Sequence, residues 1–325
     1  MYSSPWPCVN WAYGTAEREG WWGPPSATID WCEENYVISS FIAEFINTTT
    51  NLGFMVLALF LIVNTIKQGH ETRMIITALG FMLVGLGSFL FHASLLYKYQ
   101  LLDELPMVYS TCIQVWSVFE YETSKTVSVL IGLGVFAIAA IVTFVYLIIL
   151  DPMFHQVAYA ALSVAVLGRS IWQMYKEVKP AKSRKELLRM VVTGISSFLF
   201  GFLLWNIDNE ACSTLRSWRH VVGIPWGFLL ELHGWWHIFT GLGVYYYIVF
   251  LEYLRIHLLG TQDQFACIWS IGGIIPHVDR IKPKPTKSTA NGFIANGHVS
   301  NGHAKARTTQ SETRTPQTRS RTRKA

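Results

Sequence analysis

Three histidines stand in stretches of the chain that are otherwise strongly apolar: His92, His233 and His237. An ionisable side chain inside hydrocarbon is costly and usually faces a polar interior, so it marks a functional site. Three neutral imidazoles with an open fourth position form the ligand set of a catalytic zinc ion. His233 and His237 are four residues apart, which places them on one face of a helix. The pattern predicts a metal site within a membrane. The alternative is a set of interfacial histidines that hydrogen-bond locally.

The acid–base groups for such a site must come from outside the histidine pair, because no glutamate lies between the two residues as in the zinc-protease pattern. Ser88 precedes His92 by four residues, one helical turn. Asp103 and Glu104 stand just before Pro106, where a carboxylate is also favoured simply by the dipole of a starting helix. A carboxylate beside a metal could deprotonate an attacking water and then protonate a leaving amine.

The elements that must position these residues are membrane helices. Hydrophobic residues make up 51% of the chain and charged residues only 14%, against about 25% charged in soluble proteins. A membrane-spanning helix needs about 20 apolar residues. The sequence predicts an all-α polytopic membrane protein with seven such helices and an intramembrane zinc site, the third helix being the weakest; the ranges are 45–66, 74–97, 101–119, 126–150, 152–175, 190–207 and 232–251.

The distribution of basic residues predicts the orientation. The loop between the fifth and sixth predicted helices is rich in lysine and arginine and lies on the same side as the basic C-terminal tail, so this side is cytosolic and the N-terminus is luminal. No cleavable signal peptide is visible, so the first helix is expected to act as the targeting signal. In this topology His92, Asp103, His233 and His237 converge at one depth near the luminal side.

The two ends of the chain differ in charge. Residues 1–35 are acidic and residues 277–325 form a basic tail predicted to be disordered. The net charge of +5 is therefore not a nucleic-acid-binding face. The tail either touches anionic lipid or is simply solvated.

The acidic and amide residues Asp30, Glu33, Glu34, Asn35 and Glu44 could bind calcium, although on composition alone acidic capping of the first helix is the favoured interpretation.

Several motifs, taken in order, resemble those of the alkaline ceramidases over about residues 17–260, and the length and tail are similar to those of fungal members. The matching motifs are Asp30–Tyr36, Ala43–Phe45, Gly87–His92, Gln100–Met107, Phe154–Val157, Leu204–Asn209 and His233–His237. One minor departure is Gly234, where the family usually has alanine. The resemblance implies a seven-helix intramembrane zinc amidase that hydrolyses ceramide, dihydroceramide or phytoceramide to a sphingoid base and a fatty acid.

The resemblance also implies individual roles. The zinc ligands would be His92, His233 and His237, with Ser88 as catalytic hydroxyl and Asp103 as acid and base. It implies a calcium site, which reverses the expectation from composition, at Asp30, the Trp31 carbonyl, Glu33, Asn35 and Glu44. It further implies a disulfide between Cys32 and Cys212, free thiols at Cys112 and Cys267, and weaker substrate contacts at Tyr159 and Trp236.

The expected organisation is a luminal segment 1–35 with the calcium site, a seven-helix domain 36–260 and the cytosolic tail 277–325, in the endoplasmic reticulum or Golgi membrane.

The first alternative function is that of a zinc-containing receptor of the progestin and adiponectin receptor group, but the N-terminus of such a receptor would be cytosolic. The second is a transporter or channel, which would favour internal repeats or broken helices, and no repeat is visible in the sequence. A scaffold with incidental histidines is the third.

Overall fold

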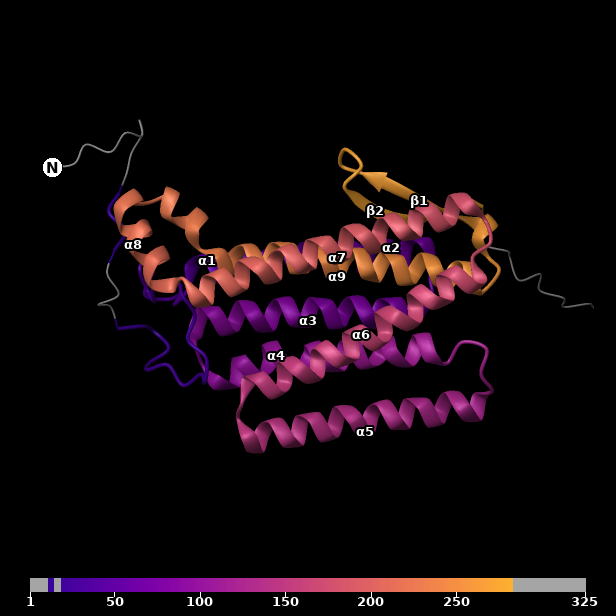
Figure 1. Cartoon of the computed structure of the whole chain (residues 1–325), viewed down its shortest axis with the longest axis horizontal. Helices are drawn as coiled ribbons and strands as arrows, with labels where there is room; N and C mark the ends of the chain where they lie inside the picture. The colour runs from indigo at the N-terminus through magenta and orange to yellow at the C-terminus, as the bar shows by residue number, and fades with distance from the viewer. Residues whose placement is uncertain (1–10, 15–18, 283–325) are drawn as a thin grey trace, which may run out of the picture. The chain divides into compact units, whose positions relative to one another are not determined.

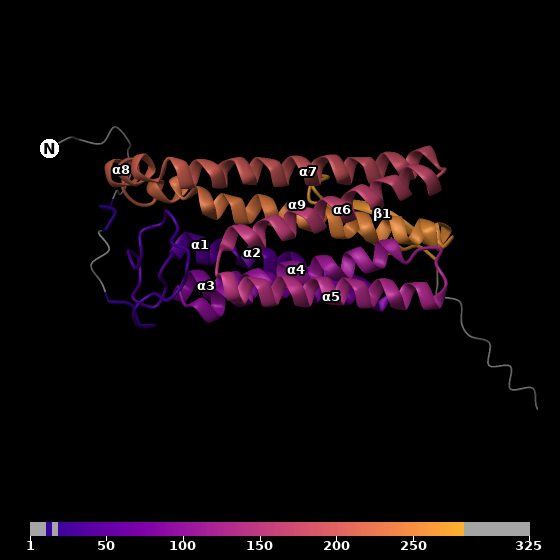
Figure 2. The ribbon, with the colours of Figure 1, turned by 60° about the horizontal axis from the view of Figure 1, so that its bottom comes forward.

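The computed structural model describes residues 11–14 and 19–282, all of which belong to one compact unit, Met1–Pro283. The helices run side by side, as Figures 1 and 2 show. They are α1 (Phe45–Thr50), α2 (Leu52–Gln68), α3 (Thr72–Ser94), α4 (Tyr97–Phe119), α5 (Lys125–Ile149), α6 (Pro152–Glu177), α7 (Ala181–Glu210), α8 (Cys212–Val222), η1 (Trp226–Leu230), α9 (Leu232–Leu258) and η2 (Gln262–Gln264). Two strands follow, β1 (Phe265–Ser270) and β2 (Ile275–Arg280).

Each range predicted to be a membrane helix is largely helical in the structure. The range 45–66 is divided at Asn51, and the range 74–97 runs past the end of α3 over Leu95 and Leu96. Five segments of the described chain are long and apolar enough to cross a bilayer: Phe45–Gln68, α3, α5, α6 and α7. The remaining long helices, α4 and α9, contain 23 and 27 residues but carry charged side chains such as Asp103, Glu104 and Glu252. The structure thus confirms a mostly helical membrane protein, and a membrane crossing by α4 and α9 stays a prediction.

The packing centres on α9, which contacts α1, α2, α3, α6 and α7. Its residues Tyr245, Val249 and Phe250 are fully buried in the main hydrophobic core. Close approach of α7 and α9 depends on glycines, since a Cβ at Gly243 would lie 3.0 Å from the carbonyl oxygen of Gly194. Small residues at helix crossings allow this separation inside membranes. The ionisable side chains of His233, His237 and Glu252 on α9 are therefore buried among neighbouring helices.

Two further segments differ from the sequence prediction. The segment between the predicted helices 190–207 and 232–251, for which no helix was predicted, contains the end of α7, α8 and η1. The tail was expected to be disordered from residue 277, yet β2 extends to Arg280 and pairs with β1 in an antiparallel hairpin, in the register Phe265↔Arg280 to Ser270↔Ile275. The all-α prediction therefore missed one small sheet, and residues 283–325 of the predicted tail lie outside the described part.

The segment before α1 closes one end of the helices through backbone hydrogen bonds to the end of α3. The amides of Ser26 and Ala27 both donate to the Leu95 carbonyl at 3.0 Å. The amide of Glu44 donates to the carbonyl of His92 at 3.0 Å. These bonds bring the acidic residues of the segment next to the first of the three histidines.

Candidate active site

The three histidines meet at one place in the structure. His92 comes from α3, and His233 and His237 come from successive turns of α9. One ligand atom from each lies within 4.8 Å of the other two, and all three side chains are buried. It is the one group of three or more histidine, cysteine or acidic residues that could hold a metal within the described ranges. The residues fit a three-histidine metal site of the kind that zinc prefers.

The rings are oriented by polar neighbours. Nδ1 of His92 hydrogen-bonds to the carboxylate of Glu44. Nδ1 of His237 lies 3.0 Å from the hydroxyl oxygen of Thr50. That hydroxyl donates to the carbonyl of Ile46 at 2.8 Å, so its oxygen is available to accept from the ring. When Nδ1 of a histidine carries the proton, Nε2 is left with the lone pair that binds a metal.

His233 is held differently from the other two. Its ring packs against the indole of Trp31, with 4.2 Å between the ring centroids. Its Nδ1 is buried and has no hydrogen-bond partner among the described residues. A buried polar atom without a partner is costly and requires an explanation, such as a bound ion. The unpaired Nδ1 of His233 therefore supports a metal ion bound by the three histidines.

Ser88 and Asp103 lie beside the histidines. The two side chains interact across the contact of α3 and α4. Gly87 allows that contact, because a Cβ there would lie 2.1 Å from the carbonyl oxygen of Leu102. Both Ser88 and Asp103 line the same cavity as the three histidines. The structure therefore brings together the five residues that the sequence assigned to zinc binding and catalysis.

The neighbouring carboxylate, Glu104, is engaged elsewhere. It accepts a hydrogen bond from the hydroxyl of Tyr146 on α5, and the amide of Gln100 lies 3.4 Å away. The Glu104 carbonyl lies 2.8 Å from Nε2 of His155 on α6. These bonds fasten α4 to α5 and α6. Of the two adjacent acids, Glu104 is thus engaged with α5 and α6, and Asp103 is the better candidate for a role at the histidines.

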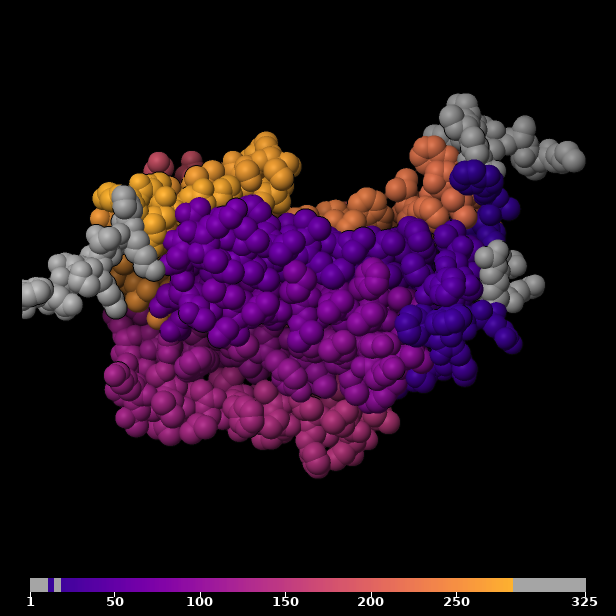
Figure 3. Space-filling view, turned by 180° about the vertical axis from the view of Figure 1, so that it is seen from behind, coloured from indigo at the N-terminus to yellow at the C-terminus, as the bar shows by residue number. Residues whose placement is uncertain are grey.

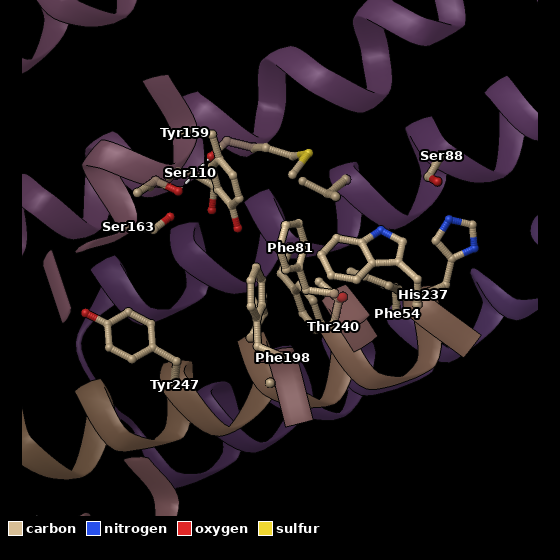
Figure 4. Close-up of a pocket in the computed structure, with 18 of the residues that line it drawn as sticks. Phe54, Phe81, Ser88, Ser110, Tyr159, Ser163, Phe198, His237, Thr240 and Tyr247 are labelled. Atoms are coloured by element: carbon tan, nitrogen blue, oxygen red, sulfur yellow. Dashed lines mark hydrogen bonds between the residues drawn. The ribbon is translucent and has the colours of Figure 1, made fainter. Parts of the chain in front are cut away.

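The site opens into a cavity of about 580 Å³ within the helices. In Figure 4 Ser88 and His237 stand at one end of it, and Tyr159, Ser163 and Tyr247 stand at the other. Aromatic side chains line the length between them, among them Phe54, Phe81 and Phe198. Tyr159 and Trp236, the weaker substrate contacts suggested by the sequence, also line the cavity. A long apolar cavity with few polar groups suits a lipid chain.

The residues expected to bind calcium cluster before α1. The Glu33 carboxylate accepts from the amides of Ile46 and Asn47 at 2.7 and 2.8 Å and so caps α1. Burial, followed by repulsion from Glu44, raises the pKa of Glu33 to about 8. Burial likewise raises the pKa of Glu44 to about 8. Two buried carboxylates in this state would be stabilised in their ionised form by a bound cation.

Oxygen atoms without donors accompany these acids. In the described part of the chain, Oδ1 of Asn35 and Oε1 of Glu44 are buried without a hydrogen-bond partner. Asp30 and Asn35 line a second, smaller cavity of about 290 Å³. The Trp31 carbonyl accepts from Arg216 at 3.3 Å. Carboxylate, amide and carbonyl oxygens are the ligands that calcium takes, so this donor set fits the ion.

A disulfide between Cys32 and Cys212 ties this segment to α8, as the family resemblance implied. Beside it the sequence missed a fully buried cation, Arg219. Its guanidinium donates to the Cys32 carbonyl at 2.8 Å and pairs with Glu231, just before α9, at 2.8 Å. The hint in the sequence was the four-residue spacing of Leu215 and Arg219, which places both on the face that α8 buries.

The remaining cysteines of the described chain, Cys112 and Cys267, are free thiols, as expected. The histidine centre, the catalytic pair and the cavity depend on elements from both halves of the chain. Known proteins with a similar sequence should therefore match along most of its length, rather than over one motif.

Comparison with known proteins gives such matches. The family model described as Ceramidase matches residues 23–279. Alkaline ceramidase 3 of Mus musculus is 42% identical over 256 residues, covering 78% of this chain and 94% of the relative. Alkaline ceramidase YPC1 of Saccharomyces cerevisiae is 38% identical over 272 residues, covering 80% and 86%. An alkaline ceramidase of Arabidopsis thaliana is 28% identical over 263 residues, covering 81% and 96%. The chain belongs to the alkaline ceramidase family.

Proposed function

We propose that this enzyme is a zinc-dependent intramembrane amidase that hydrolyses ceramide to a sphingoid base and a free fatty acid. The observation that carries the proposal is the convergence of His92, His233 and His237 at one end of a long apolar cavity. The names of the relatives supply the substrate class. A substrate with two alkyl chains is soluble in the bilayer, so it would enter the cavity from the side.

The three histidines would hold the zinc ion, with Glu44 and Thr50 orienting two of the rings. Bound zinc supplies Lewis acidity and lowers the pKa of a coordinated water. Asp103 would accept a proton from the attacking water as its oxygen bonds to the amide carbon. Ser88 would donate a hydrogen bond to the oxygen that becomes negatively charged. Asp103 would then return the proton to the nitrogen as the C–N bond breaks.

The proposal is tested with the purified full-length protein and a panel of ceramides, by measuring fatty-acid release and zinc content. His237→Ala should lose its zinc and nearly all of its activity, since removing a metal ligand removes the metal's chemistry. His257→Ala, on the same helix but outside the site, should keep both. Full hydrolysis by His237→Ala would contradict the zinc mechanism, and a zinc-loaded wild type that hydrolyses no ceramide would contradict the activity.

We also propose a calcium ion bound by Asp30, Glu33, Asn35, Glu44 and the carbonyl of Trp31. The unpaired oxygens of the described cluster support it. Calcium should raise the midpoint of thermal unfolding of the wild type, because a ligand that binds only the folded state stabilises it. Asn35→Ala should abolish the rise, whereas Asn209→Ala on α7 should not. Equal calcium responses in all three proteins would exclude this site.

We further infer that seven helices span the membrane of the endoplasmic reticulum or Golgi, with the N-terminus luminal and the C-terminus cytosolic. The Cys32–Cys212 disulfide supports a luminal position of the segment before α1, because disulfides persist in oxidising compartments. Protease protection of tags at the two ends of the chain in sealed microsomes tests the orientation. An accessible N-terminal tag would contradict it.

A further inference from the structure

The hairpin of β1 and β2 ends in a strongly apolar tip. Its turn is Ile271-Gly272-Gly273-Ile274, in which both glycines have positive φ. The side chains of Ile271 and Ile274 are 72% and 55% exposed. A tip of this composition at the end of an ordered hairpin would be expected to find an apolar partner.

The hairpin rises along the helices instead of extending beyond them. At its base, the side chain of Gln68 donates to Asp279. One turn further into α2, Asn64 donates to the Val278 carbonyl at 3.0 Å. One turn further again, the ring of Phe60 meets His277. Figures 1 and 3 show the two strands alongside α2, at the end of the helices opposite to the segment before α1.

The depth of the tip can be measured against an ionic layer at this end of the helices. Arg255 on α9 pairs with Glu71 and Glu120 at 3.0 and 3.6 Å. Tyr246, whose hydroxyl donates to the Ile274 carbonyl, precedes Arg255 by nine residues on α9. Nine helical residues advance about 13 Å. The headgroup region of a bilayer is only about 5–8 Å thick on each side, so a tip at the level of Tyr246 passes through it.

Several backbone carbonyls at and beside the tip are paired within the protein, as a position in hydrocarbon would require. Irregular backbone within a bilayer must have its polar groups paired inside the protein. The carbonyl of Gly273 accepts from Arg189 at 2.8 Å. The carbonyl of Ile274 accepts from Tyr246, and that of Pro276 accepts from Tyr245 at 2.6 Å. Three carbonyls at the turn and the start of β2 are thus paired with side chains of α7 and α9, while the isoleucine side chains of the turn are exposed.

The flanks of the hairpin agree with this placement. The guanidinium of Arg189 stacks on the indole of Trp269, 3.6 Å from the ring centroid, and Trp269 donates to Glu186 at 2.7 Å. The charged groups of α7 nearest to the hairpin are therefore paired with it. On the same helix, the apolar side chains of Leu188 and Val192 are 39% and 56% exposed.

We propose that β1 and β2 form a re-entrant membrane hairpin, whose tip contacts the acyl chains of the leaflet opposite to the three histidines. The hairpin would cover the part of α9 that lies between α2 and α7 and fasten the end of the helical domain to the membrane. The partner it fits is hydrocarbon, because the exposed side chains of the turn are isoleucines and the carbonyls of Gly273 and Ile274 are already paired.

Spin labelling in lipid vesicles tests the insertion. Cys8, Cys112 and Cys267 are replaced by alanine, the disulfide is kept, and one new cysteine is labelled with a nitroxide. At Ile271→Cys the label should collide with oxygen, which concentrates in hydrocarbon, far more often than with a water-soluble nickel chelate. Two matched controls bracket the result: Phe136→Cys on α5, where the native side chain is 72% exposed, and Glu122→Cys in the turn between α4 and α5.

A tip within the bilayer gives an accessibility ratio close to that of Phe136→Cys. A ratio close to that of Glu122→Cys would overturn the proposal. Labels at Ile274→Cys and Lys282→Cys give an independent reading, since the ratio should fall steadily from the tip to the base. A uniformly water-accessible hairpin would also overturn the proposal. None of these readings depends on ceramide hydrolysis, so they remain decisive whether or not the proposed activity is found.

Discussion

The ring of His92 is positioned from two sides, by its own helix and by the carboxylate of Glu44 that binds its Nδ1. Carboxylates that hold a metal-binding histidine in this way raise its basicity and fix its tautomer. Glu44→Gln should therefore lower the zinc affinity of the enzyme about 10–100-fold. Competition with a chromophoric chelator at saturating calcium measures this. Glu34→Gln, which removes a partner of His220 instead, should leave the zinc affinity unchanged; equal affinities in both variants would show that Glu44 does not support His92.

The adjacent acids Asp103 and Glu104 are expected to behave differently when each is made neutral. Asp103→Asn should lower kcat about 10²–10⁴-fold, the usual contribution of a general acid or base, while zinc content stays normal. Glu104→Gln should mainly lower the thermal unfolding midpoint, because its carboxylate binds Tyr146 across a helix contact. Steady-state kinetics and zinc analysis of the two proteins separate the roles. Comparable losses of kcat in both would contradict a special role for Asp103.

At the scale of helices, the site depends on how closely α3 and α4 approach each other. A Cβ at Gly87 would overlap the backbone of Leu102 and Asp103, at 2.1 Å from the nearest carbonyl oxygen and 2.8 Å from the amide nitrogen of Asp103. Gly87→Ala should therefore push α4 away, cost about 1–3 kcal/mol of stability and move Asp103 from the histidines. The measurements are thermal unfolding in detergent and the rate of ceramide hydrolysis.

Gly53→Ala on α2 is the matched control, because a Cβ there meets no atom of the described residues within 4 Å. The change should leave activity intact and raise stability slightly, as alanine is the better helix former by about 0.5–1 kcal/mol. If Gly87→Ala were as active and as stable as Gly53→Ala, the close contact of α3 and α4 would not be what positions Asp103.

Much of this arrangement could be predicted from the sequence, because membrane helices are long and uniformly apolar. The spacing of His233 and His237 also predicted their common face directly. The contact between Glu44 and His92 could not be predicted from local pattern, because it joins residues 48 positions apart through tertiary packing. The hairpin was missed for a compositional reason: β2 contains Pro276 and directly precedes a polar tail, whereas its stability comes from docking on α2 and α9.

For the molecule as a whole, the cavity links the histidines to the opposite half of the helices. His237 and Tyr247 both line it and are ten residues apart on α9, a separation of about 15 Å. Ser163 of α6 lies at the far end, opposite to the histidines (Figure 4). The far end of the cavity should limit the length of the alkyl chain, because the amide must reach the histidines while the alkyl chain fills the remaining space.

Ser163→Phe should shorten the cavity without touching the residues of the histidine centre. Hydrolysis of long-chain ceramides should fall about tenfold or more relative to short-chain ceramides, since even a single misplaced methylene in a tight pocket can cost that much. Val157→Phe, also on α6 but at a side chain 60% exposed and outside the cavity lining, should leave the ratio unchanged. The measurement is kcat/KM across a series of acyl lengths. An unchanged ratio in Ser163→Phe would mean that the alkyl chain lies elsewhere, and that the far end of the cavity does not select the substrate.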